Sequence, residues 1–267
     1  MLKRIVLGVV AVLILAYGGL VTYLYFNQRA FFFFPEGEVL DLAGTGFDAE
    51  LVSFPTTDGG VLNGWYAEPA PGFPVILYYK GNSGSFTEEY SRYTAFQEAG
   101  YGVLAFDYRG FPASPGEITE ANILADSLAA FDWLAGHDVP IVIWGRSLGA
   151  SPASYVASQR NAEALLLETP FYSAAAVAME RYPFVPIDLL MLDPFRTHEW
   201  VGGIEEPTMV AHGTADTTIS VGNGERLYAE LPRRAGLWIV EGAGHSDLWD
   251  AGIWDQAQTF FATYAMR

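Results

Sequence analysis

Six short runs of aliphatic, β-branched and aromatic residues recur between residues 75 and 240. Because each run is continuously apolar rather than alternating, it predicts a strand buried on both faces, as in a parallel sheet. Helical patterns separate the runs, and segments 50–55 and 61–68 predict an antiparallel hairpin before them. This alternation predicts an α/β fold with a mostly parallel sheet of about eight strands and helices on both faces. The predicted strands are 75–79, 102–106, 141–144, 164–167, 208–211 and 237–240, and the predicted helices are 86–99, 118–135, 148–159, 221–231 and 248–264.

The N-terminal segment 5–26 contains 22 consecutive residues without a charge. A helix that crosses a bilayer needs about 20 such residues. Lys3 and Arg4 precede the segment, which predicts a cytoplasmic N-terminus and an outer (periplasmic, extracellular or lumenal) location for the rest. We therefore expect a membrane anchor at 1–26 and one domain at 27–267. A cleaved signal peptide, which would release a secreted protein, is the alternative, with a small-residue cleavage site near Gly18.

Composition excludes several classes of function. The chain of 267 residues has 31 acidic and 14 basic residues, a net charge of −17, and such a surface repels nucleic acid. There are no cysteines, so disulfides, a thiol nucleophile and a thiolate zinc site are excluded. Hydrophobic residues make up 51% of the sequence, which excludes a disordered chain.

Two further segments bear on the organisation of the domain. Residues Phe31–Phe34 follow the apolar segment, and their rings fit either the membrane headgroup region or the cover of the first strand. Residues 170–206 separate two predicted strands by more than a crossover requires and include Pro183, Pro186 and Pro194. Long connections of this kind are often lids, so we expect a helix and a small apolar cap after the sixth strand.

A nucleophile motif follows the strand at 141–144. Residues 145–149 read Gly-Arg-Ser-Leu-Gly, a G-x-S-x-G pattern between a buried strand and an Ala- and Ser-rich helix. The pattern predicts that Ser147 sits on a sharp turn with its hydroxyl above the sheet. Side chains at Gly145 and Gly149 would collide with the neighbouring strand and helix.

A serine hydroxyl needs a base, and the base needs an acid that orients it. His245 follows the last predicted strand in a glycine-containing loop, and Asp216 follows the preceding strand. With Ser147, the three residues lie at the carboxyl ends of three strands, where ligands of open α/β sheets bind. The remaining candidates have other predicted roles: His137 caps a helix, His212 packs in a turn, and Asp247 orients the loop or caps the final helix. His198 lies in the cap region, where a contact with the substrate stays open as an alternative.

An acyl-transfer site also needs amide donors for the oxyanion. The N–H of Leu148, which follows the nucleophile at a helix N-terminus, is one candidate. The second is the backbone N–H of Asn82, in the loop after the strand at 75–79. An ordinary glycine-rich turn would read the same way, and the loop lacks the Gly-Lys-Ser/Thr order of a phosphate-binding loop.

Together these motifs resemble the α/β-hydrolase superfamily, and in particular single-pass, membrane-tethered serine hydrolases related to dienelactone hydrolases and prolyl-oligopeptidase catalytic domains. The resemblance covers nearly all of 27–267 and implies Ser147, Asp216 and His245 as the triad, with no cofactor and no metal. One departure is Lys80, which stands where relatives usually carry His before Gly-Asn. Besides the triad and the 145–149 turn, the segments that carry the likeness are 80–82, 107–111, 168–171, 212–216 and 242–245.

The expected function is therefore hydrolysis of an ester, thioester or related acyl bond in a small or lipid-like substrate. Acyl transfer to another acceptor and peptide cleavage use the same triad and stay open as alternatives, as does a catalytically inactive, membrane-held interaction domain. Asp107 and Arg109 are expected to be structural residues of a loop beside the site.

Overall fold

The computed structural model describes residues 1–266, and eight strands in it form one sheet. The strand order is β1-β2-β4-β3-β5-β6-β7-β8; β2 runs antiparallel to both of its neighbours, and the remaining pairs are parallel. The fold predicted from the sequence is confirmed. The strands are β1 Glu50–Pro55, β2 Val61–Ala67, β3 Val75–Tyr79, β4 Gly102–Phe106, β5 Ile141–Arg146, β6 Ala164–Glu168, β7 Thr208–Gly213 and β8 Arg234–Val240.

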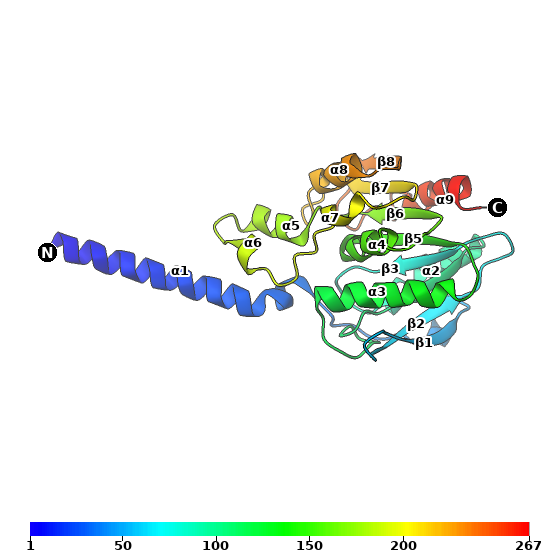
Figure 1. Ribbon diagram of the computed structural model, residues 1–267, viewed down its shortest axis with the longest axis horizontal. Helices are drawn as coiled ribbons and strands as arrows, with labels where there is room; N and C mark the ends of the chain where they lie inside the picture. Colours follow the sequence, from blue (N-terminus) through cyan, green and yellow to red (C-terminus); the bar gives the residue numbers. More distant parts are fainter. Residues whose placement is uncertain (267) are drawn as a thin grey trace.

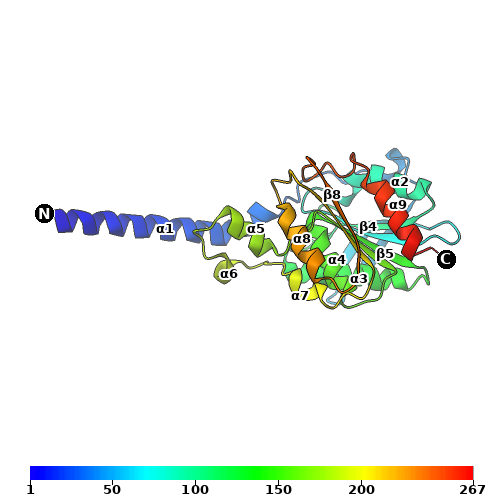
Figure 2. The ribbon, with the colours of Figure 1, turned by 90° about the horizontal axis from the view of Figure 1, so that it is seen from above.

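Helices cover both faces of the sheet and bury its apolar side chains in two clusters (Figure 2). On one face pack α3 (Glu120–Ala135), α4 (Ala150–Ala157) and α8 (Val221–Glu230). On the other pack α2 (Tyr90–Glu98) and α9 (Ile253–Tyr264). Both faces of the central strands are therefore dry, which explains why their sequences are continuously apolar.

Some predicted boundaries differ from those of the structure, and in each case a local turn explains the difference. The predicted helix at 86–99 begins as a 3₁₀ turn, η2 (Phe86–Glu89), and the one at 148–159 is preceded by another, η3 (Ser147–Gly149). The final helix begins at Ile253 rather than 248, because the chain makes a further turn that ends at Gly252 with φ 95°. Positive φ favours glycine and interrupts a right-handed helix.

The connection from β6 to β7 forms the small cap that the sequence predicts. It contains α5 (Ala174–Arg181), α6 (Ile187–Leu190) and α7 (His198–Val201). The first two lie beside the N-terminal helix (Figure 1). A short 3₁₀ turn, η1 (Leu42–Gly44), lies in the segment before β1.

The N-terminal helix α1 (Leu2–Phe32) has 31 residues and projects away from the domain (Figure 1). In the part of the chain that the structure describes, it is the one helix long and apolar enough to cross a membrane, by length and composition. The helix does not stop at residue 26 but continues to Phe32. No proline, glycine or charge run separates the apolar segment from the domain, so the sequence gives no signal for an earlier end.

The four phenylalanines at the end of α1 divide between two environments. Phe33 is buried and, together with Phe32, packs against Phe195 of the cap connection. Phe31 and Phe34 are about half exposed, at 52% and 46%. Phe34 pairs with Ser83 in an isolated parallel bridge rather than in a strand of the sheet. Neither the headgroup nor the first-strand interpretation therefore describes all four rings.

Candidate active site

Ser147 lies on a sharp turn between β5 and η3. Its φ is 52°, in the left-handed region that a non-glycine residue rarely adopts, and such strain concentrates at functional sites. Gly145 and Gly149 permit the turn. A Cβ on Gly145 would lie 2.5 Å from the Gly149 carbonyl oxygen, and a Cβ on Gly149 would overlap the carbonyl group of Tyr79 in β3.

The structure brings the three predicted triad residues together. His245 Nε2 lies 2.9 Å from Ser147 Oγ, and His245 Nδ1 lies 2.7 Å from Asp216 Oδ2. Ser147 follows β5, Asp216 follows β7 and His245 follows β8, so the sheet itself fixes the spacing of the three side chains. This continuous chain of hydrogen bonds can carry a proton from the serine hydroxyl to the imidazole.

Asp216 is held as an ionised carboxylate. Burial opposes its ionisation, but hydrogen bonds from His212, His245 and the Ile219 N–H outweigh this and hold the pKa of Asp216 well below its usual range. The second carboxylate oxygen, Oδ1, accepts from the backbone N–H groups of Thr218 and Ile219 at 2.8 and 2.9 Å. The carboxylate is thus fixed in orientation from both sides.

His212 has a role that the sequence did not predict. It is fully buried at the end of β7, as expected of a packed histidine, but its Nε2 also lies 3.3 Å from Asp216 Oδ2. The same nitrogen lies 2.9 Å from the Ile219 carbonyl oxygen, so it carries the proton and donates toward both acceptors. The sequence of β7, an apolar strand with a histidine near its end, does not predict this contact between His212 and Asp216.

The loop after β3 lies against the nucleophile. A Cβ built on Gly81 would lie 3.9 Å from Ser147 Cβ, so the next residue, Asn82, is close to the reaction centre. Asn82 is anchored elsewhere through its side chain, which donates to the Phe32 carbonyl oxygen at 2.6 Å. Its own carbonyl accepts from Phe34 N–H at 2.8 Å. Leu148 is buried at the start of η3, directly after the nucleophile.

Lys80, the departure from the family pattern, is buried beneath this loop. Its ammonium lies 3.7 Å from Asp107 Oδ1 and 3.9 Å from the centre of the Phe111 ring. Burial lowers the pKa of Lys80 to about 8, against the opposing effect of Asp107, and burial also raises the pKa of Asp107. The Asp107 carboxylate accepts from Ser85 Oγ, Phe86 N–H and Ala113 N–H at 2.8–3.0 Å.

A second buried ion cluster lies beside the turn that carries Ser147. Arg92 binds the Glu168 carboxylate through two hydrogen bonds of 2.8 and 3.0 Å, and Trp144 donates to the same carboxylate at 2.9 Å. Arg146, beside the nucleophile, lies 3.5 Å from Glu168. Burial opposes ionisation of Glu168, but the two arginines outweigh it and lower its pKa.

The other candidates from the sequence make contacts outside the triad. His137 Nδ1 lies 3.1 Å from the Trp133 carbonyl oxygen at the end of α3, and His198 stacks on the Tyr172 ring. Asp247 accepts from the Gly244 N–H at 2.7 Å and so orients the loop that carries His245. Arg109 pairs with Asp126 and Asp58 within its own region of the fold.

No family model matches the chain, but known proteins resemble it in sequence and in fold. A Mycobacterium tuberculosis protein described as uncharacterised is 35% identical over 248 residues, which cover 90% of this chain and 88% of the relative. The lysophosphatidylserine lipase ABHD12 of Xenopus tropicalis is 32% identical over 188 residues, 61% of this chain and 48% of that lipase. The match therefore spans about half of the lipase.

Solved structures share the fold. An esterase of Pyrococcus furiosus superposes with a TM-score of 0.71 at 21% identity, over 87% of this chain and 98% of the esterase. The chain therefore has the α/β-hydrolase fold. An acetyl xylan esterase from Paenibacillus superposes on this chain with a TM-score of 0.64 at 20% identity, over 81% of this chain and 88% of the esterase. Within residues 1–266, which the structure describes, no group of three or more His, Asp and Glu side chains is arranged to hold a metal ion.

Proposed function

We propose that this chain is a membrane-tethered serine hydrolase that cleaves a carboxylic ester or thioester through an acyl-enzyme intermediate. The observation that carries the proposal is the hydrogen-bonded chain from Ser147 Oγ through His245 to Asp216. The positive φ of Ser147 supports it, because such backbone strain persists where the surrounding structure enforces it.

In the proposed reaction, the Ser147 hydroxyl oxygen attacks the carbonyl carbon of the substrate while His245 Nε2 takes the hydroxyl proton. The oxyanion that forms accepts hydrogen bonds from the N–H groups of Asn82 and Leu148. His245 then gives the proton to the leaving alcohol or thiol, the bond to the leaving group breaks, and the acyl group remains on Ser147. A water molecule, deprotonated by His245, attacks next and releases the acid, which restores the serine hydroxyl.

Asp216 acts in this scheme by accepting the Nδ1–H of His245, which leaves Nε2 free to take the serine proton. Its low pKa keeps it ionised while the imidazole becomes positive during each transfer. His212 is a positioning residue, because it reaches the reaction only through the carboxylate of Asp216.

A lipid-like substrate is supported by two independent points. The relative ABHD12 is named a lysophosphatidylserine lipase, and the apolar helix α1 would hold the active site beside a bilayer. The charge pattern around α1 favours an N-terminus in the cytoplasm and the hydrolase domain on the outer side. The acidic composition argues against nucleic acid as a partner.

A fluorophosphonate probe tests the proposal, because it reacts with an activated serine hydroxyl. Wild-type protein in detergent should be labelled and should hydrolyse p-nitrophenyl acetate, whereas Ser147→Ala should do neither. Ser246→Ala is a matched control, since Ser246 lies beside His245 in sequence and accepts from Arg146 rather than from the triad. Labelling that survives in Ser147→Ala, or its absence from folded wild-type protein, would refute the proposal.

A further inference from the structure

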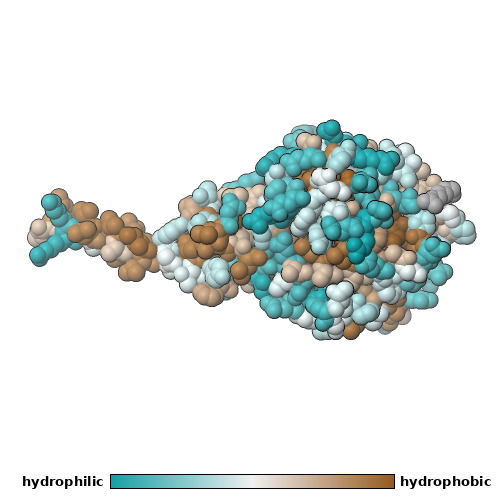
Figure 3. Space-filling view, in the orientation of Figure 1, coloured by the Kyte–Doolittle hydropathy of each residue, from teal (hydrophilic) through white to brown (hydrophobic). Residues whose placement is uncertain are grey.

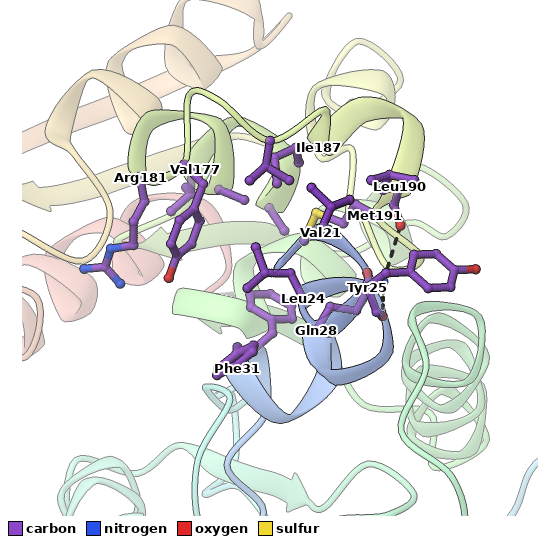
Figure 4. A pocket seen from close by; sticks show the side chains of 15 residues that line it. Val21, Leu24, Tyr25, Gln28, Phe31, Val177, Arg181, Ile187, Leu190 and Met191 are labelled. Atoms are coloured by element: carbon purple, nitrogen blue, oxygen red, sulfur yellow. Dashed lines mark hydrogen bonds between the residues drawn. The ribbon is translucent and has the colours of Figure 1, made fainter. Parts of the chain in front are cut away.

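The contact between α1 and the cap encloses an apolar pocket with a volume of about 180 Å³ (Figure 4). One wall is the C-terminal third of α1 and the other is the cap. Of the residues that line it, one is charged, Arg181, and it lies at the edge of the lining in Figure 4. The lining residues are Val21, Leu24, Tyr25, Gln28, Phe31 and Phe32 from α1, with Ala174, Val177, Ala178, Arg181, Tyr182, Val185, Ile187, Leu190 and Met191 from the cap.

The pocket adjoins the candidate active site. Phe32 in its wall accepts the hydrogen bond from the side chain of Asn82, in the loop that follows β3. Ala174, in the opposite wall, begins the first helix after β6. Because β3 and β6 are the two neighbours of β5 in the sheet, these two walls lie on either side of the turn that carries Ser147. Both walls are therefore connected to segments that flank the strand carrying Ser147, at the same edge of the sheet.

The other end of the pocket lies at the level of the bilayer. A span of about 20 residues that begins at Ile5 ends near Leu24, which is already a pocket residue. The cap reaches still further along the span, because the Tyr17 hydroxyl donates to the Phe184 carbonyl oxygen at 2.6 Å. With α1 across a membrane, the tip of the cap is thus in contact with lipid.

The surface of the cap tip agrees with that placement. Phe184, Leu189 and Leu192 are 64%, 82% and 49% exposed. Figure 3 shows hydrophobic residues gathered over this part of the molecule beside α1. Adjacent exposed apolar side chains of this kind mark a membrane or ligand contact rather than a surface that faces water.

The two walls are fixed to each other by polar contacts at the base of the pocket. Gln28 accepts from the Leu192 N–H at 2.7 Å and donates to the Leu190 carbonyl oxygen at 3.3 Å. Arg29 pairs with the Asp193 carboxylate at 2.7 Å, and that carboxylate also accepts from the Glu120 N–H at the start of α3. These polar contacts therefore hold α1 against the cap, and α1 forms one wall of the pocket.

We propose that this α1–cap pocket binds the acyl chain of a single-chain membrane lipid ester, which enters from the bilayer beside α1 and reaches Ser147 from there. The inference rests on the proposed function and names its substrate class. An apolar cavity of about 150 Å³ holds a benzene molecule. The volume here therefore suits a chain segment of about six carbons, with the rest of the chain along α1 toward the lipid.

Filling the pocket tests the proposal. Val177→Trp and Leu24→Trp should lower the ratio of kcat/KM for p-nitrophenyl laurate over p-nitrophenyl acetate by about 30-fold or more, because several methylene groups lose their apolar site. Leu13→Trp is the matched control, since Leu13 lies on the same helix but away from the pocket and is 62% exposed. The control should leave the ratio unchanged.

The route of entry is tested with Leu189→Asn at the exposed cap tip. Its turnover of a monoacyl lipid ester in phosphatidylcholine vesicles should fall several-fold, while its turnover of the same ester as a dilute monomer in water should not. An equal fall in both assays would point to entry from water and overturn the bilayer route. A laurate-to-acetate ratio that stays unchanged in both tryptophan variants would overturn the pocket assignment. In each case acetate hydrolysis by the wild type still reports separately on the proposed serine chemistry.

Discussion

The carboxyl edge of the sheet and the α1–cap pocket are formed by different kinds of secondary-structure element. At the sheet edge, Ser147, Asp216 and His245 follow three strands, two of them, β5 and β7, buried along nearly their whole length. The pocket is instead formed by the end of one long helix and by α5 and α6, helices of 8 and 4 residues on an irregular connection. In the proposed function, the packed sheet holds the catalytic side chains in position. The end of α1 and the cap can then determine which substrates bind without displacing those side chains.

The difference predicts two classes of variant. Changes at the sheet edge should affect substrates of every chain length equally, because the same bonds are made and broken in all of them. Changes at the α1–cap pocket should affect long chains more than short ones. Each prediction below is a test of whether this division holds.

The largest effect is expected for Ser147→Ala. Removing the hydroxyl should lower kcat for both the acetate and the laurate ester by about 10⁶-fold, as loss of the nucleophile does in subtilisin. Steady-state assays against Ser246→Ala, with circular dichroism to show that the fold is kept, measure it. A loss restricted to one chain length would contradict the division.

Asp216→Asn should have the next largest effect. The amide cannot hold His245 in the required tautomer, so kcat should fall by about 10⁴-fold for both esters while the fold is kept. His212→Gln is a useful companion, because it changes the contacts of His212 to Asp216 and to the Ile219 carbonyl oxygen but leaves the three triad side chains in place, and it should cost far less. A larger loss in His212→Gln than in Asp216→Asn would mean that the triad has been assigned to the wrong histidine.

Lys80→Met tests the buried pair beneath the loop that carries Asn82. It leaves the Asp107 carboxylate buried without its cation, which should lower the free energy of unfolding by about 3–5 kcal/mol. The double variant Lys80→Met/Asp107→Asn should recover part of this loss, as measured by urea unfolding in detergent. Equal stability of the single variant and the wild type would show that Lys80 is not ionised in the folded protein.

Arg29→Gln should have a smaller and more selective effect. It removes the ion pair with Asp193 and loosens one wall of the pocket, so the laurate-to-acetate ratio should fall by about five-fold, equivalent to about 1 kcal/mol. Arg160→Gln is the matched control, because it breaks the ion pair with Asp132, and neither of these residues lines the pocket. The two variants should differ in chain-length selectivity and not in acetate turnover.

The smallest expected effect concerns acid stability. Asp216 has a folded-state pKa below its unfolded value of 3.8, so its contribution to stability is present above about pH 4 and is lost as the pH falls through the lowered pKa. The difference in free energy of unfolding between wild type and Asp216→Asn should therefore narrow between pH 6 and pH 3. A difference that widens on acidification would reverse the sign of the linkage.

Sequence reasoning predicted the sheet edge better than the pocket, for a physical reason. Ser147 and His245 stand in short glycine-containing motifs next to apolar strands, so local patterns place them. His212 contacts Asp216 only because the chain turns back between these two residues, four positions apart. The sequence of the strand does not predict this contact. The pocket is formed by residues of α1 and of the cap that lie more than 140 positions apart in the sequence. Their apolar side chains are equally typical of a membrane-spanning helix and of a protein core.

The end of α1 has one further consequence. The helix runs without interruption to Phe32, and the next residue, Phe33, is buried in the core with only 4% of its surface exposed. No flexible linker therefore lies between Phe32 and the domain. A flexible linker would let the active site search a volume that grows with linker length. Under the proposed anchoring, the serine would instead have a single fixed height above the bilayer and a single fixed face toward it. Lipid esters of its own membrane would come to that height by lateral diffusion, whereas those of an apposed membrane or a passing particle would remain beyond its reach.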